Sequence, residues 1–147
     1  TEIQALVSSS QLANPRRTAI GLDPNRIALI VAVLEKTTGI NLFNQDIYVN
    51  VAGGLKLSEP ATDLAIALAL ISSYKNRPLP NHLVAFGEVA LSGEIRPVGF
   101  SDQRIQEAAK LGYNKIIIPK KTRLTSTPEQ VEILSFRTVA EVVDGVI

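Results

Sequence analysis

The sequence lacks cysteine, methionine and tryptophan, and its 147 residues include a single histidine, His82. Without cysteine, the chain cannot form disulfides, thiolate zinc sites or iron–sulfur clusters, and it has no thiol nucleophile. One histidine is also too few for a metal site built from several imidazoles. His82 could act as a general base, but the sequence assigns it neither a nucleophile on a sharp turn nor an orienting carboxylate.

An excess of one charge is missing as well. Fifteen Lys and Arg residues against fourteen Asp and Glu residues leave a formal net charge of +1. No global basic field therefore points to nucleic acid, although a local basic patch is compatible with these numbers. Hydrophobic residues make up 46% of the chain, which is enough to bury a sizeable core and too many for a disordered protein.

Long hydrophobic runs, secretion signals and nucleotide loops are also absent. The longest apolar run, residues 64–71, is far too short to span a bilayer, and no Asn-x-Ser/Thr sequon occurs. No Gly-x-x-x-x-Gly-Lys-Ser/Thr loop is present to hold the phosphates of a nucleotide. We expect a cytoplasmic protein with no membrane partner. Because the chain does not begin with methionine, we also expect it to be a fragment of a longer protein.

The hydrophobic pattern predicts strands and helices that mix without strict alternation. Helices are expected from Asp23-Pro24 to Gly39, from Ser58-Glu59-Pro60 through the apolar run, from Ser101 to Leu111, and after a Thr138/Glu141 capping box. The strands are expected at residues 2–7, 46–51, 83–86, 88–91, 115–118 and 131–136. This pattern predicts an α/β (α+β) fold, a mixed sheet with packed helices, in one domain over residues 1–147.

Carboxylates that could form an acid/base pair are scattered along the chain. Most of them fall at expected caps, turns or solvent-facing strand positions, so paired acid/base chemistry is not favoured. They are Asp46, Glu59, Asp63, Glu88 and Glu94.

Two segments resemble the proteolytic domain of the Lon protease family. Residues 56–64, Lys-Leu-Ser-Glu-Pro-Ala-Thr-Asp-Leu, are similar to the loop that carries the Lon serine at the start of a buried helix. Residues 87–99, Gly-Glu-Val-Ala-Leu-Ser-Gly-Glu-Ile-Arg-Pro-Val-Gly, are similar to the hairpin before the helix that carries the Lon lysine. In that family the lysine accepts the proton of the attacking serine.

The two Lon catalytic positions fall on Ala61 and Asp102. A methyl group cannot attack a carbonyl, and a carboxylate cannot replace a desolvated amine. We therefore expect no catalytic residues and no enzyme activity in this chain. Two alternatives stay open: a Lon-related peptidase that uses a displaced hydroxyl such as Thr62 or Ser58, and a remnant that binds peptides without cleaving them. Ser58 and Ser101 are better interpreted as helix caps.

A second resemblance covers nearly the whole chain, from residue 2 to about residue 140. The blocks occur in order and are similar to the C-terminal part of the RadA (Sms) family of bacterial DNA-repair proteins. They are Glu2-Ile3-Gln4-Ala5-Leu6-Val7-Ser8, Asn14-Pro15-Arg16-Arg17, Gly21-Leu22-Asp23, Asn25-Arg26, Val33-Leu34-Glu35-Lys36, Asn44-Gln45-Asp46, Val51-Ala52-Gly53-Gly54, Gln103-Arg104 and Glu107-Ala108-Ala109-Lys110-Leu111-Gly112.

This resemblance implies a non-proteolytic, Lon-like scaffold domain of a hexameric DNA-repair ATPase that assists branch migration. The expected partners are single-stranded or branched DNA, further copies of the chain in a ring, and a RecA-type recombinase that meets the full-length protein. In that family a four-cysteine zinc finger and a RecA-type ATPase precede this part. We therefore expect zinc, ATP and magnesium only there, and no cofactor or metal in this chain.

The expected DNA contacts are basic side chains that hold backbone phosphates. Arg16 and Arg17 are the first candidates, because a proline stiffens their loop and two adjacent guanidiniums can hold phosphate oxygens. Arg26 lies near a helix start, where a cation is unfavourable unless an acid or an external phosphate pairs with it. Lys36 and Arg104 are weaker candidates.

Two further features bear on the DNA contact, and the second, a shortage of exposed rings, argues for binding through the DNA backbone. Lys120, Lys121 and Arg123 form a second basic stretch that is interpreted as a solvated loop. Phe86, Phe100 and Phe136 fall where core residues are expected, which leaves few rings on which bases could stack.

Overall fold

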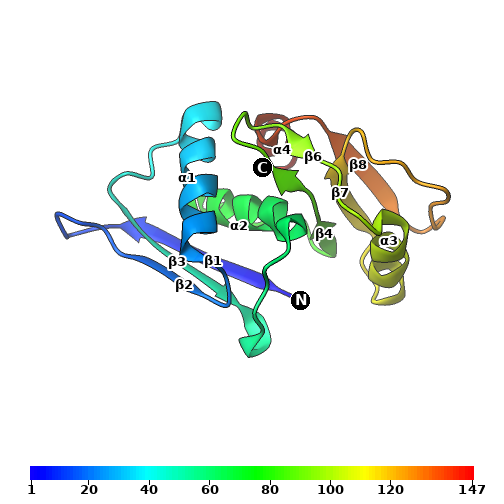
Figure 1. Ribbon diagram of the computed structural model, residues 1–147, viewed down its shortest axis with the longest axis horizontal. Coiled ribbons are helices and arrows are strands. Elements are labelled where there is room, and N and C mark those ends of the chain that lie inside the picture. Colours follow the sequence, from blue (N-terminus) through cyan, green and yellow to red (C-terminus); the bar gives the residue numbers. More distant parts are fainter.

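A computed structural model describes residues 1–147 (Figure 1). The first half of the chain forms a three-stranded sheet. Strands β1 (Ile3–Ser9), β2 (Arg17–Ile20) and β3 (Gln45–Val51) lie in the order β1-β3-β2. Strand β3 is antiparallel to β1 and parallel to β2, so this sheet is mixed as expected. Strand β2 was not predicted, because Pro15 and the paired arginines at its start are typical of a loop.

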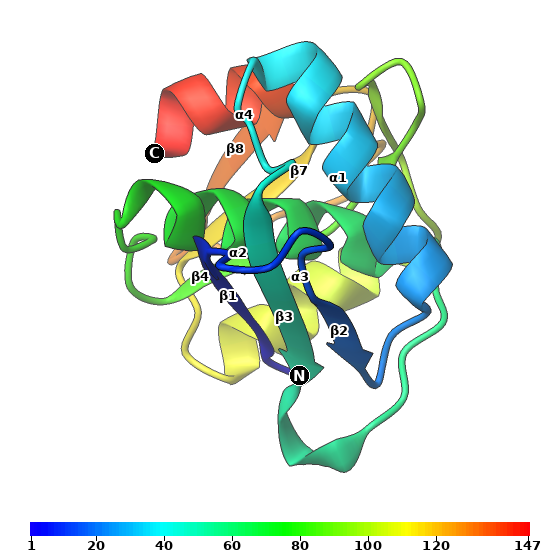
Figure 2. The same ribbon diagram turned by 90° about the vertical axis from the view of Figure 1, so that its left-hand side faces the viewer.

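Two helices cover one face of this sheet (Figures 1 and 2). Helix α1 (Pro24–Thr38) begins as predicted, since the Asp23 carboxylate accepts the backbone N–H of Asn25 at 2.9 Å, and it ends at the left-handed Gly39. Short 3-10 turns at Ala52–Gly54 and Pro60–Thr62 lead into helix α2 (Asp63–Lys75). The predicted helix at Pro60 therefore starts as a 3-10 turn and becomes α-helical at Asp63.

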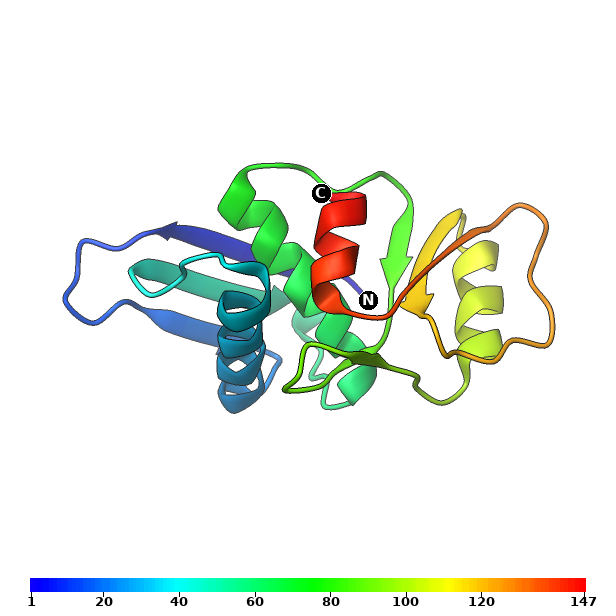
Figure 3. The same cartoon turned by 90° about the horizontal axis from the view of Figure 1, so that it is seen from above.

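Helix α2 is the central element, as its almost wholly apolar sequence predicts. Together with α4 it lies between the first sheet and a second one (Figure 3). Its side chains enter two hydrophobic clusters: Ile66 and Leu70 pack with α1 and the first sheet, and Leu64 and Leu68 pack with Ile95 and the second sheet.

The second half forms a parallel sheet and a small hairpin. Strands β4 (Leu83–Ala85), β7 (Lys115–Pro119) and β8 (Glu132–Phe136) lie in the order β4-β7-β8, and β5 (Glu88–Val89) pairs with β6 (Ile95–Arg96). Helices α3 (Ser101–Lys110) and α4 (Val139–Val146) complete the chain. The predicted α/β class is confirmed, but the strands divide among three sheets and only the first of these mixes parallel and antiparallel pairing.

The helix caps agree only in part with the sequence. The Thr138 hydroxyl accepts the N–H of Glu141, and the Glu141 carboxylate accepts the N–H of Arg137, as in a capping box shifted by one residue. Ser101 is not a cap, because its hydroxyl donates to the Val98 carbonyl and the residue that precedes α3 is Phe100. Ser58 is not one either, since no side chain caps the 3-10 turn at Pro60.

Candidate nucleic-acid interface

Arg16 and Arg17 lie at the start of edge strand β2, and both are exposed. The backbone of Arg16 is fixed on both sides: its N–H donates to Asp46 Oδ1 at 2.7 Å, and its carbonyl accepts the N–H of Ile47 at 2.8 Å. Its guanidinium forms no hydrogen bond or ion pair within the chain. Arg16 therefore combines a held backbone with a free cation.

The anchor of this loop is the Asp46 carboxylate. The hydrogen bond from the Arg16 backbone lowers the pKa of Asp46 below its ordinary value, and the charges of Arg16 and Arg17 lower it further. Because the carboxylate stays ionised in the neutral pH range, the anchor is intact under the conditions in which DNA would be bound.

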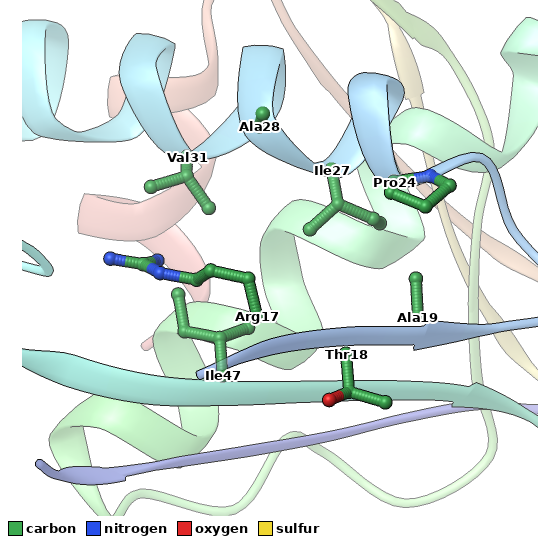
Figure 4. Close-up of a pocket in the computed structure, with 8 residues that line it drawn as sticks. All are labelled: Arg17, Thr18, Ala19, Pro24, Ile27, Ala28, Val31 and Ile47. Atoms are coloured by element: carbon green, nitrogen blue, oxygen red, sulfur yellow. The ribbon is translucent and has the colours of Figure 1, made fainter. Parts of the chain in front are cut away.

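Arg17 projects toward α1 and lines a small apolar pocket (Figure 4). One of its terminal nitrogens donates to the Leu42 carbonyl at 2.7 Å, which leaves the other N–H groups available. The pocket holds about 150 Å³, whereas pockets for small organic ligands hold roughly 300–1,000 Å³. It is lined by Arg17, Thr18, Ala19, Pro24, Ile27, Ala28, Val31 and Ile47. A pocket of this volume does not support a metabolite site.

Arg26 is paired with a buried acid, which is one of the two alternatives that the sequence left open. Its Nε donates to Asp63 Oδ1 at 2.8 Å, and one terminal nitrogen donates to Asp63 Oδ2. Asp63 Oδ2 also accepts the N–H of Val89 at 3.0 Å. The hydrogen bonds to Asp63 raise the pKa of the Arg26 guanidinium, and this effect outweighs the burial of the side chain, which alone would lower the pKa. Since the cation is used inside the fold, we remove Arg26 from the DNA candidates.

Asp63 is completely buried, with a relative exposure of 0%, although most of the five carboxylates were expected at caps, turns or solvent-facing strand positions. The sequence contains one signal of this role: Asp63 is the only charged residue between Glu59 and Lys75, at the head of a helix that is otherwise apolar. A charge in that position requires a partner. The sequence could not identify Arg26 as that partner.

Arg104 is also engaged within the chain. Its two terminal nitrogens donate to the two Glu59 carboxylate oxygens at 3.3 and 3.2 Å, and its Nε donates to the Gly99 carbonyl at 2.9 Å. The guanidinium lies 5.9 Å from the centre of the Phe86 ring. Lys36, in contrast, is exposed in the last turn of α1 and has no ionic partner. The structure thus separates the five predicted residues into bound Arg26 and Arg104, partly bound Arg17, and free Arg16 and Lys36.

The two positions of the Lon dyad lie in different surroundings. Ala61 is 5% exposed in an apolar cluster with Phe86 and Ile105. Asp102 is partly exposed in the first turn of α3, where its carboxylate accepts the N–H of Thr125 at 3.0 Å. The Thr62 hydroxyl donates to the Glu59 carbonyl at 2.9 Å. No hydrogen bond joins a hydroxyl to a lysine or a histidine in this region.

The structure exposes two phenylalanine rings. Phe43 is 75% exposed and Phe100 is 73% exposed, so the expectation that Phe100 belongs to the core is wrong. Phe86 is buried as expected. No group of three or more His, Asp and Glu side chains could hold a metal ion, and each helix is too short or too polar to cross a membrane.

Comparison with known proteins gives two results. A model of the family described as subunit ChlI of Mg-chelatase matches residues 6–122. The chain is 51% identical over 140 residues to DNA repair protein RadA of Haemophilus influenzae, 48% over 140 residues to that of Escherichia coli, and 49% over 144 residues to that of Halalkalibacterium halodurans. These matches cover 95–97% of the chain but only 30–32% of each relative. The resemblance to RadA seen in the sequence blocks is confirmed, and the chain spans about a third of the length of these relatives.

Proposed function

Since the chain belongs to the family described as subunit ChlI of Mg-chelatase and is about half identical to part of DNA repair protein RadA, we propose that it is a scaffold domain of a RadA-type protein. In this role it contacts the DNA backbone and does not cleave peptide bonds. The full-length protein would be a DNA-dependent ATPase that assists branch migration of recombination intermediates.

The observation that carries the DNA contact is the free guanidinium of Arg16 on a backbone fixed by Asp46 and Ile47. A cation on a held backbone loses less conformational entropy when a phosphate binds than one on a loose loop. Arg17 adds a second cation beside it and keeps donors free, because only one of its N–H groups is used. Such contacts recognise phosphate and carry no base information.

The surroundings of the two Lon dyad positions support the proposal that the chain does not cleave peptide bonds. A Ser–Lys mechanism needs a nucleophile that is hydrogen-bonded to its base. Ala61 supplies a methyl group inside an apolar cluster, and Asp102 supplies a carboxylate that is held by a backbone N–H. The hydroxyl of Thr62 is likewise committed to a carbonyl of its own turn.

We extend the proposal to self-association of the full-length protein in a ring, with a hexamer as the expected size. A ring needs two different patches on each protomer. The face of the first sheet that the helices leave open is our candidate for one of them, since it exposes two large apolar side chains, Leu6 at 57% and Ile20 at 58%.

The DNA contact is tested by charge reversal in the isolated chain. Arg16→Glu/Arg17→Glu should lower the affinity for a fluorescent single-stranded oligonucleotide at low salt by at least tenfold, as measured by anisotropy. The matched control is Lys75→Glu/Arg77→Glu, which makes the same charge change at two exposed residues, the last residue of α2 and the second residue after it. An equal loss of affinity in both variants would mean that net charge alone binds the DNA, and the proposed contact would then be refuted.

A further inference from the structure

A second hollow in the surface lies at the start of α3, away from Arg16 and Arg17. It holds about 480 Å³ and is open to solvent. The loop between β6 and α3 supplies one wall, and the loop after β7, which runs beside α3 in Figure 3, supplies the other. The lining residues are Pro97, Val98, Phe100, Ser101, Asp102, Gln103, Lys121, Thr122 and Arg123.

The first unusual feature of this hollow is Phe100. Its backbone is in the left-handed region at φ 62°, where a bulky residue is a rare outlier, and its ring is 73% exposed. The Phe100 carbonyl accepts the N–H of Arg104 at 2.9 Å as the first hydrogen bond of α3, whereas the ring is left largely in solvent. Strained residues of this kind are typical of binding and catalytic sites. An exposed ring beside cations is the arrangement on which proteins stack a base of single-stranded nucleic acid.

The second feature is the positive charge that lines the same hollow as the ring. Lys121 and Arg123 are both exposed, and Arg123 has no ionic partner. The only partner of Lys121 is Glu94, at 3.5 Å, and the two side chains are 76% and 40% exposed, so water competes strongly for this pair. One acid, Asp102, also lines the hollow, and its Oδ1 accepts the N–H of Thr125, so the basic residues of the lining outnumber the acidic ones by two to one. The hollow therefore presents two available cations.

The third feature is an unsatisfied hydroxyl. Thr122 lies between the two cations in the sequence and lines the hollow, and its Oγ1 is buried without any hydrogen-bond partner. It is the only buried side-chain polar atom of the chain in this condition. Buried polar groups are nearly always satisfied, so this unpaired hydroxyl marks the loop that carries the two cations as one whose local packing is incomplete. No side chain caps the N-terminus of α3, which leaves its first N–H groups facing the same region.

We propose that this hollow is a second DNA site, which binds one phosphate of a single strand and stacks the adjoining base on Phe100. Lys121 and Arg123 hold the phosphate, and the exposed ring receives the base. The choice of DNA as ligand rests on the proposed function, whereas the site itself rests on the geometry above. Since a duplex keeps its bases stacked inside, the ring distinguishes single strands from duplexes.

The test uses the binding of a fluorescent oligothymidylate and of a duplex of equal length. Phe100→Ala should weaken single-strand binding about tenfold, because base–aromatic stacking contributes on the order of 1–3 kcal/mol per base, and should leave duplex binding nearly unchanged. The matched control is Phe43→Ala, which removes the other highly exposed ring. Lys121→Ala/Arg123→Ala should weaken single-strand binding by tenfold or more, and Lys75→Ala/Arg77→Ala serves as its control. Thermal melting checks that each variant is folded.

The outcomes separate this inference from the proposed function. If the Arg16/Arg17 variant loses single-strand affinity while the Phe100 and Lys121/Arg123 variants keep it, the second site is refuted and the proposed function stands. Equal losses in Phe100→Ala and Phe43→Ala would also refute it. If the unmodified chain binds neither single strands nor duplex at low salt, both proposals fail.

Discussion

The pair formed by Arg26 and Asp63 allows a quantitative prediction, because it joins α1, α2 and β5 through one buried carboxylate. The Asp63 side chain is 1% exposed and accepts hydrogen bonds from Arg26 and from the Val89 N–H, whereas the Arg26 side chain is 33% exposed. The two partners therefore differ in what happens when the other is removed. We expect Arg26→Ala to destabilise the fold more than Asp63→Ala.

The magnitudes follow from this difference in exposure. Arg26→Ala leaves a buried carboxylate with one remaining donor and should cost about 4 kcal/mol, within the range of 3–5 kcal/mol for breaking a buried ion pair. Asp63→Ala leaves a guanidinium that can turn toward water and should cost about 2 kcal/mol. The double variant Arg26→Met/Asp63→Leu removes both charges, and we expect it to be more stable than Arg26→Ala alone.

Urea unfolding measures these free energies, and thermal melting gives a second estimate. For a chain of this size 1 kcal/mol corresponds to about 2–4 °C, so Arg26→Ala should lower the Tm by about 8–16 °C. DNA affinity, measured where each variant is fully folded, should change little. Unchanged stability together with a large loss of DNA affinity in Arg26→Ala would refute the structural role of this arginine.

Three further predictions concern the Arg16 anchor, the dyad positions and the turn after β2. Folding lowers the pKa of Asp46, so its contribution to stability is present above its ordinary pKa of 3.8 and is lost as the pH falls through the lowered value. The free energies of unfolding of wild type and Asp46→Asn, measured in urea, should therefore differ at neutral pH and converge in strong acid. A difference that stays constant with pH would contradict this. Ala61→Ser/Asp102→Lys should not cleave casein, because residue 61 is buried in an apolar cluster, and measurable cleavage would show that the groove of a peptidase is intact. Gly21→Ala should destabilise the fold by about 2 kcal/mol or more, since φ is +83° and a Cβ there would meet the Leu55 carbonyl and Val51, whereas Gly53→Ala, at φ +82° in open space, should cost less. Equal costs for the two glycines in urea unfolding would contradict the predicted clash.

Local signals predicted most of the elements. Asp23-Pro24 and Gly39 mark the two ends of α1, and Thr138 with Glu141 marks the start of α4, because caps act over three or four residues that are adjacent in the sequence. Strand β2 was missed for the opposite reason. Its four residues are held by pairing with β3, which lies about thirty residues further along the chain, and the proline and arginines at its start are typical of a loop.

The candidate site was predictable only as a set of residue types. Sequence identified the arginines, but whether each one is free depends on partners far along the chain: Arg26 and Asp63 are 37 residues apart, and Arg104 and Glu59 are 45 apart. Phe100 shows the same limit. Hydrophobicity favours a buried ring, and only the left-handed backbone at the start of α3 turns it outward.

The salt dependence of DNA binding tests the proposed phosphate contacts most directly. Each phosphate that a protein neutralises on a single strand contributes about 0.7 to the slope of log affinity against log salt. The account predicts that Arg16→Ala/Arg17→Ala lowers this slope by about 1.4 relative to the unmodified chain, while Lys75→Ala/Arg77→Ala leaves it unchanged. An unchanged slope in the Arg16/Arg17 variant would contradict the account, because these arginines would then not touch phosphate.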